Sequence, residues 1–94
     1  MAERGALRLA AVDIGAESGR VLVGTFDGGR LAIEDVHRFP NVPVTVAGTM
    51  HWDALRLFGD ITTGLRKAGA AGDVASVGVD TWGVDFALLD ERGR

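Results

Sequence analysis

Residues 13–20 gather, within one short segment, the groups that could bind a phosphate and a metal ion. They read Asp13-Ile14-Gly15-Ala16-Glu17-Ser18-Gly19-Arg20. Small residues let backbone N–H groups come close to a phosphate, and successive amides form an anion-binding nest. Ser18 can donate from its hydroxyl and Arg20 from a charged fork. Asp13 is suited to hold Mg²⁺ through water, since Mg²⁺ keeps much of its hydration shell.

This stretch departs from the two common nucleotide-binding patterns. It is neither G-x-x-x-x-G-K-[ST] nor G-x-G-x-x-G, and the segment after it is rich in strand-forming residues instead of helix formers. Neither a P-loop nor a Rossmann turn therefore fits. A tight hairpin carrying a surface aspartate remains the alternative to phosphate binding.

A second stretch with possible chemistry is Asp80-Thr81-Trp82-Gly83-Val84-Asp85. It follows an apolar run, and ligands tend to bind at strand ends in mixed sheets. The ring face of Trp82 could pack on the C–H groups of a sugar while the carboxylates accept from its hydroxyls. Gly83 would let a ligand approach the backbone. The alternative is that Trp82 belongs to the core and both aspartates cap turns.

The first site must be positioned by three strands. Residues 9–14 form a short apolar strand, residues 20–26 are rich in strand formers, and residues 31–39 alternate imperfectly. The Asp27-Gly28-Gly29 sequence between the second and third is a strong hairpin signal. Together these segments predict an antiparallel meander.

A helix and further strands follow. Residues 40–51 are irregular, with room for a short extended piece. Asp53 is a good N-cap for a helix over residues 54–68, and Gly69 and Gly72 are expected to stop it. Gly59 and Gly64 should weaken this helix by about 1 kcal/mol each relative to alanine. Its expected buried face comprises Leu55, Phe58, Ile61 and Leu65.

The chain is expected to continue with a buried strand over residues 74–79, a break over 80–83, and a fifth strand or continuation over 84–89. Residues 90–93 form a turn signal. The chain stops where a hairpin should return, so we interpret residues 1–94 as the opening of a longer protein.

Composition excludes several classes of protein. The chain has 94 residues, 47% of them hydrophobic, a net charge of −3 and no cysteine. These values fit an ordinary globular domain and argue against a disordered tail, a membrane span and a basic nucleic-acid footprint. The absence of cysteine removes disulfides and thiolate zinc sites and favours the cytoplasm. No signal peptide is evident.

The two histidines and the Trp52-Asp53 pair are expected to have structural roles. His37 and His51 are too far apart to suggest a local metal pair, and His37 is expected on a strand face. Trp52 and Asp53 are expected to staple and cap the helix.

Taken together, these segments resemble the FGGY family of carbohydrate kinases, and within it the members that act on L-rhamnulose. The most specific match is the stretch from Val77 to Phe86, running into Leu88-Leu89-Asp90. The other matching segments are Val12 to Ala16 with Ser18 to Val21, His37-Arg38-Phe39, and Trp52-Asp53. The resemblance covers nearly all of the chain from Leu9 onward.

The resemblance implies an α/β fold, the amino-terminal portion of the ribonuclease-H-like ATPase fold shared with actin and heat-shock chaperones. Residues 1–94 would form part of the first of two kinase domains. The implied reaction is transfer of the ATP γ-phosphoryl group to the 1-hydroxyl of L-rhamnulose, in L-rhamnose breakdown. ATP and Mg²⁺ are the implied cofactors. The implied partners are the ketose and ATP, without nucleic acid or membrane.

The resemblance also assigns residue roles. Asp13 would sit near Mg²⁺, and Gly83 and Trp82 would contact the ketose. The catalytic base and the adenosine contacts lie beyond residue 94, so no catalytic residue is assigned and the fragment alone should be inactive. Residues lining the ATP phosphates would be Ala16, Glu17, Ser18, Gly19 and Arg20.

Glu17 departs from the family pattern, because many members have serine or threonine there. We expect its side chain to point away from the phosphates, which an inward carboxylate would repel.

Three alternatives remain open at this stage. The first is another FGGY kinase, for L-fuculose or D-xylulose, and the second is a non-metabolic ATPase of the actin type. The third is an interaction domain without a ligand.

Overall fold

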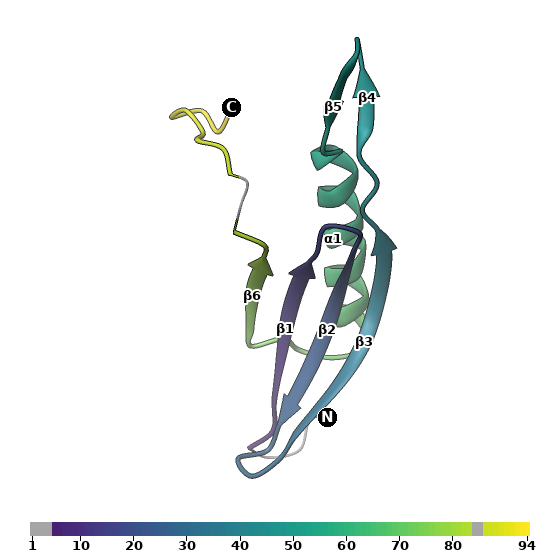
Figure 1. Ribbon diagram of the computed structural model, residues 1–94. Coiled ribbons are helices and arrows are strands. Elements are labelled where there is room, and N and C mark those ends of the chain that lie inside the picture. The colour runs from purple at the N-terminus through teal and green to yellow at the C-terminus, as the bar shows by residue number, and fades with distance from the viewer. Residues whose placement is uncertain (1–4, 84–85) are drawn as a thin grey trace.

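Four strands in the order β3-β2-β1-β6 form the main sheet, and one helix lies along one of its faces (Figure 1). The computed structural model describes residues 5–83 and 86–94. The elements are β1 (Leu7–Ile14), β2 (Ser18–Phe26), β3 (Leu31–Pro40), β4 (Val44–Val46), β5 (Thr49–His51), α1 (Ala54–Ala70) and β6 (Ser76–Thr81). No helix in the described ranges is long and apolar enough to cross a membrane.

The predicted meander is confirmed: β1 pairs with β2 and β2 with β3, both antiparallel. Asp27 closes the second hairpin, because its Oδ1 accepts hydrogen bonds from the N–H groups of Gly29 (3.0 Å) and Arg30 (2.8 Å). Gly28 has a φ of 98°, which a residue with a side chain rarely adopts.

The same two backbone donors, Gly29 first, hold the pKa of Asp27 below its ordinary value. A carboxyl whose pKa is lower in the folded state stabilises that state above its unfolded pKa. The contribution is lost as the pH falls through the lowered value.

The helix packs on the sheet through a narrower stripe than the sequence predicts. Leu57, Ile61 and Leu65, which follow one another at about one helical turn, pack against the buried side chains of Val12, Val21 and Phe39. The expected positions Ile61 and Leu65 are therefore confirmed.

The prediction that Leu55 and Phe58 are buried is wrong, since their side chains are 89% and 71% exposed. The reason lies in Gly64 and Ala68, the two buried residues of α1. These small residues turn the side of the helix that carries Leu57 toward the sheet, and Leu55 and Phe58 are rotated out.

Gly64 allows this close approach. A Cβ built on Gly64 would lie 2.8 Å from Val21 Cβ and closer still to Val21 Cγ2, and 3.2 Å from His37 Cβ. The prediction that this glycine only weakens the helix is incomplete, because its missing side chain sets the distance between α1 and the sheet.

The ends of the irregular segments also differ from expectation. Residues 40–51 hold a two-stranded hairpin, β4 and β5, with positive φ at Ala47 and Gly48.

The end of the helix also differs from the prediction. The helix runs through Gly69 and ends after Ala70, so of the two predicted stops only Gly72 lies beyond its end. Arg8 Nη1 donates to the carbonyl of Ala68 (3.0 Å), one of the acceptors that a helix end leaves open, and to that of Gly72 (2.6 Å) just beyond the helix.

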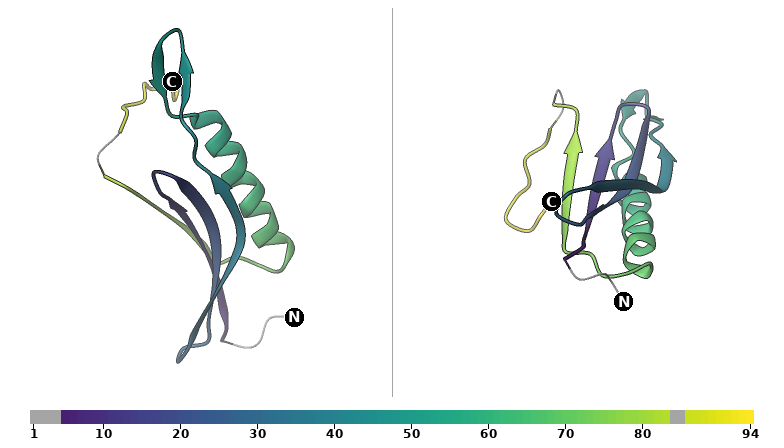
Figure 2. Two further views of the ribbon diagram at one scale, coloured as in Figure 1. Left: turned by 45° about the vertical axis from the view of Figure 1, so that its right-hand side comes forward. Right: turned by 90° about the horizontal axis from the view of Figure 1, so that it is seen from below.

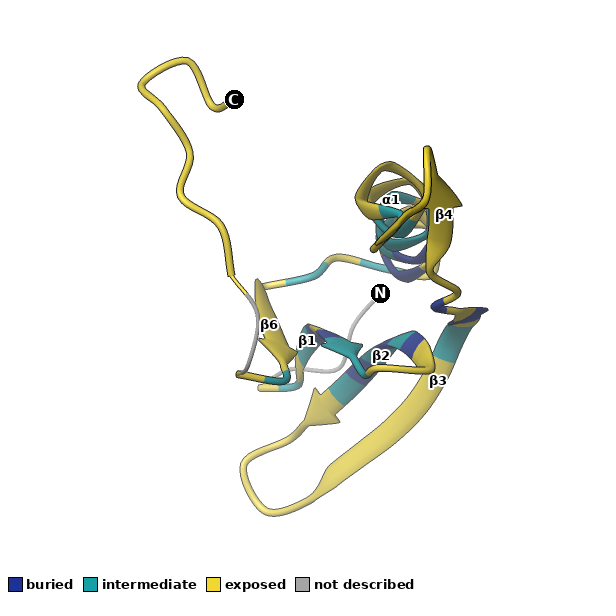
Figure 3. Ribbon diagram, turned by 45° about the horizontal axis from the view of Figure 1, so that its top comes forward, coloured by how far each residue is buried: buried dark blue, intermediate teal, exposed yellow. Residues whose placement is uncertain are grey.

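Strand β6 runs parallel to β1, from Leu9 opposite Ser76 to Ile14 opposite Thr81. The expected burial of this strand is wrong within the described chain, where every residue of β6 is exposed and Val79 is 67% exposed. The helix explains this, because α1 packs mainly over β2 and β3 and leaves β6 uncovered (Figures 2 and 3).

The structure describes the last part of the chain except for residues 84–85. The predicted strand over 84–89 begins with Val84 and Asp85, which lie outside the described residues, and residues 86–89 form no strand. The predicted turn over 90–93 is confirmed: Asp90 Oδ1 accepts from Arg92 N (2.9 Å) and Arg94 N (2.8 Å), and Gly93 has a φ of 79°.

Gly64→Ala should destabilise the full-length protein even though alanine is the better helix former. Overpacking against Val21 costs about 1–3 kcal/mol, which exceeds the gain of about 1 kcal/mol in helix propensity. Gly59→Ala is the matched control, because a Cβ there meets no described atom within 4 Å. Urea unfolding should show a lower midpoint for Gly64→Ala and an equal or higher one for Gly59→Ala. A stabilised Gly64→Ala variant would contradict the packing described here.

Candidate functional site

The turn between β1 and β2 is held by hydrogen bonds from the end of β3. Gly15 N donates to Ser18 O (2.8 Å), which closes the turn on itself. Asn41 donates twice, from its backbone N to Glu17 O (2.9 Å) and from Nδ2 to Gly15 O (2.9 Å). Asn41 is only 3% exposed. It therefore fixes the predicted phosphate turn from a distant part of the sequence, and sequence reasoning missed it.

The predicted phosphate-binding residues divide into two groups. Ala16 and Glu17 are exposed at the tip of the turn, and the exposure of Glu17 agrees with a side chain directed outward. Gly19 is buried, and a Cβ there would overlap the ring of Phe39. Packing against Phe39 thus accounts for this glycine.

A line of alternating charges crosses the ends of the strands beside the turn. Arg20 Nε lies 3.2 Å from Asp13 Oδ2, and Arg20 Nη1 lies 3.9 Å from Asp35 Oδ1. Arg38 Nε then lies 3.5 Å from Asp35 Oδ2. These side chains are partly exposed, so each pair is worth at most about 1 kcal/mol. Their value is positional, since the pairs aim two guanidinium groups at one place.

That place is a hollow of about 300 Å³, lined by Asp13, Gly15, Ser18, Arg20 and Arg38. Two guanidinium groups, a hydroxyl and a carboxylate fit a phosphate accompanied by a divalent cation. The structure therefore brings Ser18, Arg20 and Asp13 together as predicted, and it adds Arg38 to the set.

The strand register also joins the two stretches that the sequence analysis treated separately. Asp13 on β1 is directly opposite Asp80 on β6, although the two residues are far apart in the sequence. Paired residues of neighbouring strands share a face of the sheet, so both carboxylates project on the face away from α1. Asp80 lies within β6, so the alternative in which Asp80 caps a turn is wrong.

The donor set around Asp13 suits Mg²⁺ better than a cation that needs a full protein cage. No group of three or more metal-ligating side chains exists within residues 5–83 and 86–94. Mg²⁺ is commonly bound by one or two carboxylates plus water and substrate phosphates. Asp13 and Asp80 would supply that number.

On the other side of the sheet edge, two tryptophans meet. The rings of Trp52 and Trp82 contact edge to face, with centroids 5.1 Å apart and planes at 65°. They border a hollow of about 270 Å³ whose other lining residues are Ile14, Leu57, Thr81, Phe86 and Ala87. From the sequence, Trp52 was expected only to staple the helix terminus, so its contact with Trp82 was not predicted.

Gly83 follows this aromatic pair directly. Its φ lies outside the left-handed region, and a Cβ there meets no described atom within 4 Å. Neither backbone strain nor packing among the described residues demands glycine at this position. Asp85, the other acidic residue of this stretch, lies outside the described residues.

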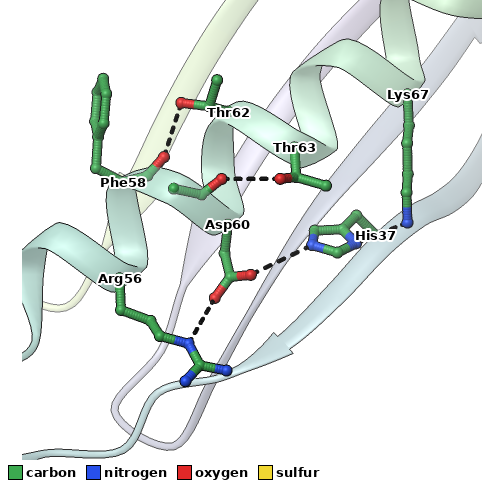
Figure 4. A network of polar contacts seen from close by, with 8 residues as sticks. His37, Arg56, Phe58, Asp60, Thr62, Thr63 and Lys67 are labelled. Carbon is green, nitrogen blue, oxygen red and sulfur yellow. Dashed lines mark hydrogen bonds and ion pairs between the residues drawn. The ribbon is translucent and has the colours of Figure 1, made fainter.

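His37 is on a strand face, as predicted, and it takes part in a polar network between β3 and α1 (Figure 4). Its Nδ1 lies 3.0 Å from Lys67 Nζ, and its Nε2 lies 3.7 Å from Asp60 Oδ1. Arg56 Nε lies 3.7 Å from Asp60 Oδ2, one helical turn away. This network ties the helix to the sheet and is separate from both hollows.

Comparison with known proteins agrees with the resemblance seen in the sequence. The chain is similar to rhamnulokinases. It is 46% identical over 85 residues to the rhamnulokinase of Bacteroides thetaiotaomicron, covering 89% of this chain and 18% of that protein. It is 43% identical over 91 residues to that of Mannheimia succiniciproducens, covering 94% and 19%, and 44% identical over 84 residues to that of Bacillus subtilis, covering 88% and 17%.

The match has a defined extent. The chain spans about a fifth of the length of these relatives and corresponds to their amino-terminal part. No protein-family model matches it. The expected resemblance to rhamnulokinases is thus confirmed for this part.

Asn41→Ala should lower the free energy of unfolding of the full-length protein by about 1–3 kcal/mol, because it removes a buried donor and leaves Gly15 O unpaired. Amide hydrogen exchange should quicken at residues 15–18. Val42→Ala is the control, since Val42 is 62% exposed and adjacent. Unchanged exchange at the turn in Asn41→Ala would show that Asn41 does not hold it.

Proposed function

We propose that this chain is the amino-terminal part of an ATP-dependent carbohydrate kinase that phosphorylates L-rhamnulose at its 1-hydroxyl. The observation that carries the proposal is the pairing of β1 with β6. This pairing brings Thr81 and Trp82, which line the aromatic hollow, to the end of β1, where Asp13 and Gly15 line the charged hollow. The names of the similar proteins support L-rhamnulose as the substrate.

On the nucleotide side, the turn and its neighbours would hold the phosphates of ATP. Ser18 and the two arginines, Arg20 and Arg38, line the charged hollow, and the turn that contains residues 16–17 lies beside it. Arg20 is already oriented by Asp13, so its position requires little ordering when the anion binds. Asn41 keeps the turn amides in place.

Asp13 and Asp80 would hold Mg²⁺ on the same side. When bound, Mg²⁺ neutralises charge on the transferring phosphoryl group. The two carboxylates project from paired positions of adjacent strands on one face of the sheet, so both could contribute to holding one cation.

On the sugar side, Trp82 offers an apolar ring face and Gly83 an unblocked backbone. A ketose in the aromatic hollow would extend toward the charged hollow on the other side of the β1 terminus. The base that accepts the hydroxyl proton is expected outside residues 1–94. The fragment alone supplies one wall of the cleft, so it is expected to be inactive.

The substrate assignment is tested with the purified full-length protein, MgATP and three ketoses. We expect phosphorylation of L-rhamnulose at a higher kcat/KM than of L-fuculose or D-xylulose. Phosphorus NMR should show coupling of the new phosphate to the protons on C1. Preference for another ketose would assign a different sugar kinase, and ATP hydrolysis without any sugar phosphate would favour an ATPase of the actin type.

Asp13→Asn should lower kcat by at least about 100-fold, because several kcal/mol of transition-state stabilisation depend on the metal. The KM for L-rhamnulose should change by less than about threefold, since Asp13 lies on the face away from the aromatic hollow. Asp73→Asn is the control, an acidic residue between α1 and β6. An unchanged kcat in Asp13→Asn at saturating MgATP would remove Asp13 from the mechanism.

A further inference from the structure

Trp52 lies directly before the residue that caps the helix. Asp53 caps α1 by accepting from Arg56 N (3.2 Å), and Leu57 N donates to Asp53 O (3.0 Å). Trp52 immediately precedes this cap, and Leu57, which lines the same hollow, is the helical residue that a hydrophobic staple would pair with it. These hydrogen bonds fix the first turn of α1, directly after Trp52, without involving the Trp52 ring.

The ring of Trp52 also makes a contact that a hydrophobic staple does not include. It contacts Trp82, which lies beyond both α1 and β6 in the sequence, in an edge-to-face geometry. The two indoles thus form an aromatic corner, defined here as the rings of Trp52 and Trp82. This corner opens on the hollow whose other lining side chains are largely apolar.

The two hollows lie on opposite sides of the β1 terminus. Ile14 lines the aromatic one, whereas Asp13 and Gly15 line the charged one. A ketose whose 1-hydroxyl meets the phosphoryl group beside Asp13 would direct its other end, C6, away from the charged side. The aromatic corner is the wall that receives this end.

The chemistry of L-rhamnulose fits that wall. L-Rhamnulose is 6-deoxy-L-fructose, so C6 is a methyl group in one sugar and a hydroxymethyl group in the other. A methyl group gains from burial against aromatic rings, whereas a hydroxyl placed there loses its hydrogen bonds to water without replacement.

We propose that Trp52 is a specificity-determining residue that, with Trp82, binds the C6 methyl group and selects a 6-deoxy ketose. This inference rests on the proposed function. It concerns Trp52 itself, which the sequence resemblance assigns to no ligand.

The test compares L-rhamnulose with L-fructose in the full-length protein, as the wild type and as Trp52→Ala and Trp52→Phe variants. Leu55→Ala is the control, because Leu55 is 89% exposed and lies in the first turn of the same helix. The wild type should favour L-rhamnulose by 10-fold or more in kcat/KM, since an apolar pocket discriminates against an added hydroxyl by about 100-fold. Trp52→Ala should reduce that ratio to within about threefold of unity by lowering kcat/KM for L-rhamnulose. The KM for MgATP should be unchanged in every variant.

Trp52→Phe guards against loss of folding, since it keeps an aromatic ring and should retain an intermediate preference. An equal loss of kcat/KM for both sugars in Trp52→Phe would overturn the inference and leave the proposed function intact. A preference unchanged in both variants would overturn it as well. A wild type that phosphorylates neither ketose would instead overturn the proposed function on which the inference rests.

Discussion

The parallel pairing of β1 with β6 is the constraint on which the candidate site depends. It joins segments from nearly opposite ends of the chain and fixes Asp13 opposite Asp80 and Ile14 opposite Thr81. Because side chains alternate along a strand, a shift of one residue would move Asp80 to the face that carries Thr81. Thr81 meets Ile14 in the lining of the aromatic hollow only in the observed register.

Two residues outside β1 and β6, Gly64 and Asn41, stabilise the part of the sheet that carries the candidate site. Gly64 lets α1 come close to β2, and the helix thereby buries Val12 and Val21, the central contacts of the core. Asn41 then holds the β1–β2 turn through two hydrogen bonds. Gly64 acts through a missing side chain that lets α1 pack on the sheet, whereas Asn41 acts through its backbone and side-chain donors on the turn.

The sequence predicted those parts of the fold that depend on neighbours along the chain. The Asp27-Gly28-Gly29 hairpin and the Asp53 cap are closed by hydrogen bonds between near neighbours, so the residue types alone define them. The helical face could not be settled in the same way. Leu55 and Phe58 on one side and Leu57 on the other have equal apolar character, and the choice between them depends on how Gly64 meets Val21.

In the candidate site, too, the residues predicted from local sequence differ from those whose roles depend on distant contacts. Asp13, Ser18, Arg20, Trp82 and Gly83 attracted attention because their types and spacing suggest chemistry. Asn41 was not singled out, and Trp52 was assigned only to the helix terminus, because their further contacts are with distant parts of the sequence. The pairing of Asp13 with Asp80 was also hidden, since a register between distant parallel strands is not set by any local pattern.

Disulfide trapping tests this register most directly, because residues 1–94 contain no cysteine and each introduced pair is therefore the only thiol pair within them. Ala11 is paired with Gly78 on one face of the sheet, and a side chain at Gly78 meets no described atom within 4 Å. Paired strand positions fall within the distance range that a disulfide can bridge. Under mild oxidation of the full-length protein, Ala11→Cys/Gly78→Cys should cross-link readily and Ala11→Cys/Val79→Cys should not, as judged by mass spectrometry of the joined peptides. Cross-linking of the 11–79 pair in preference to the 11–78 pair would show a different register and contradict the site described here.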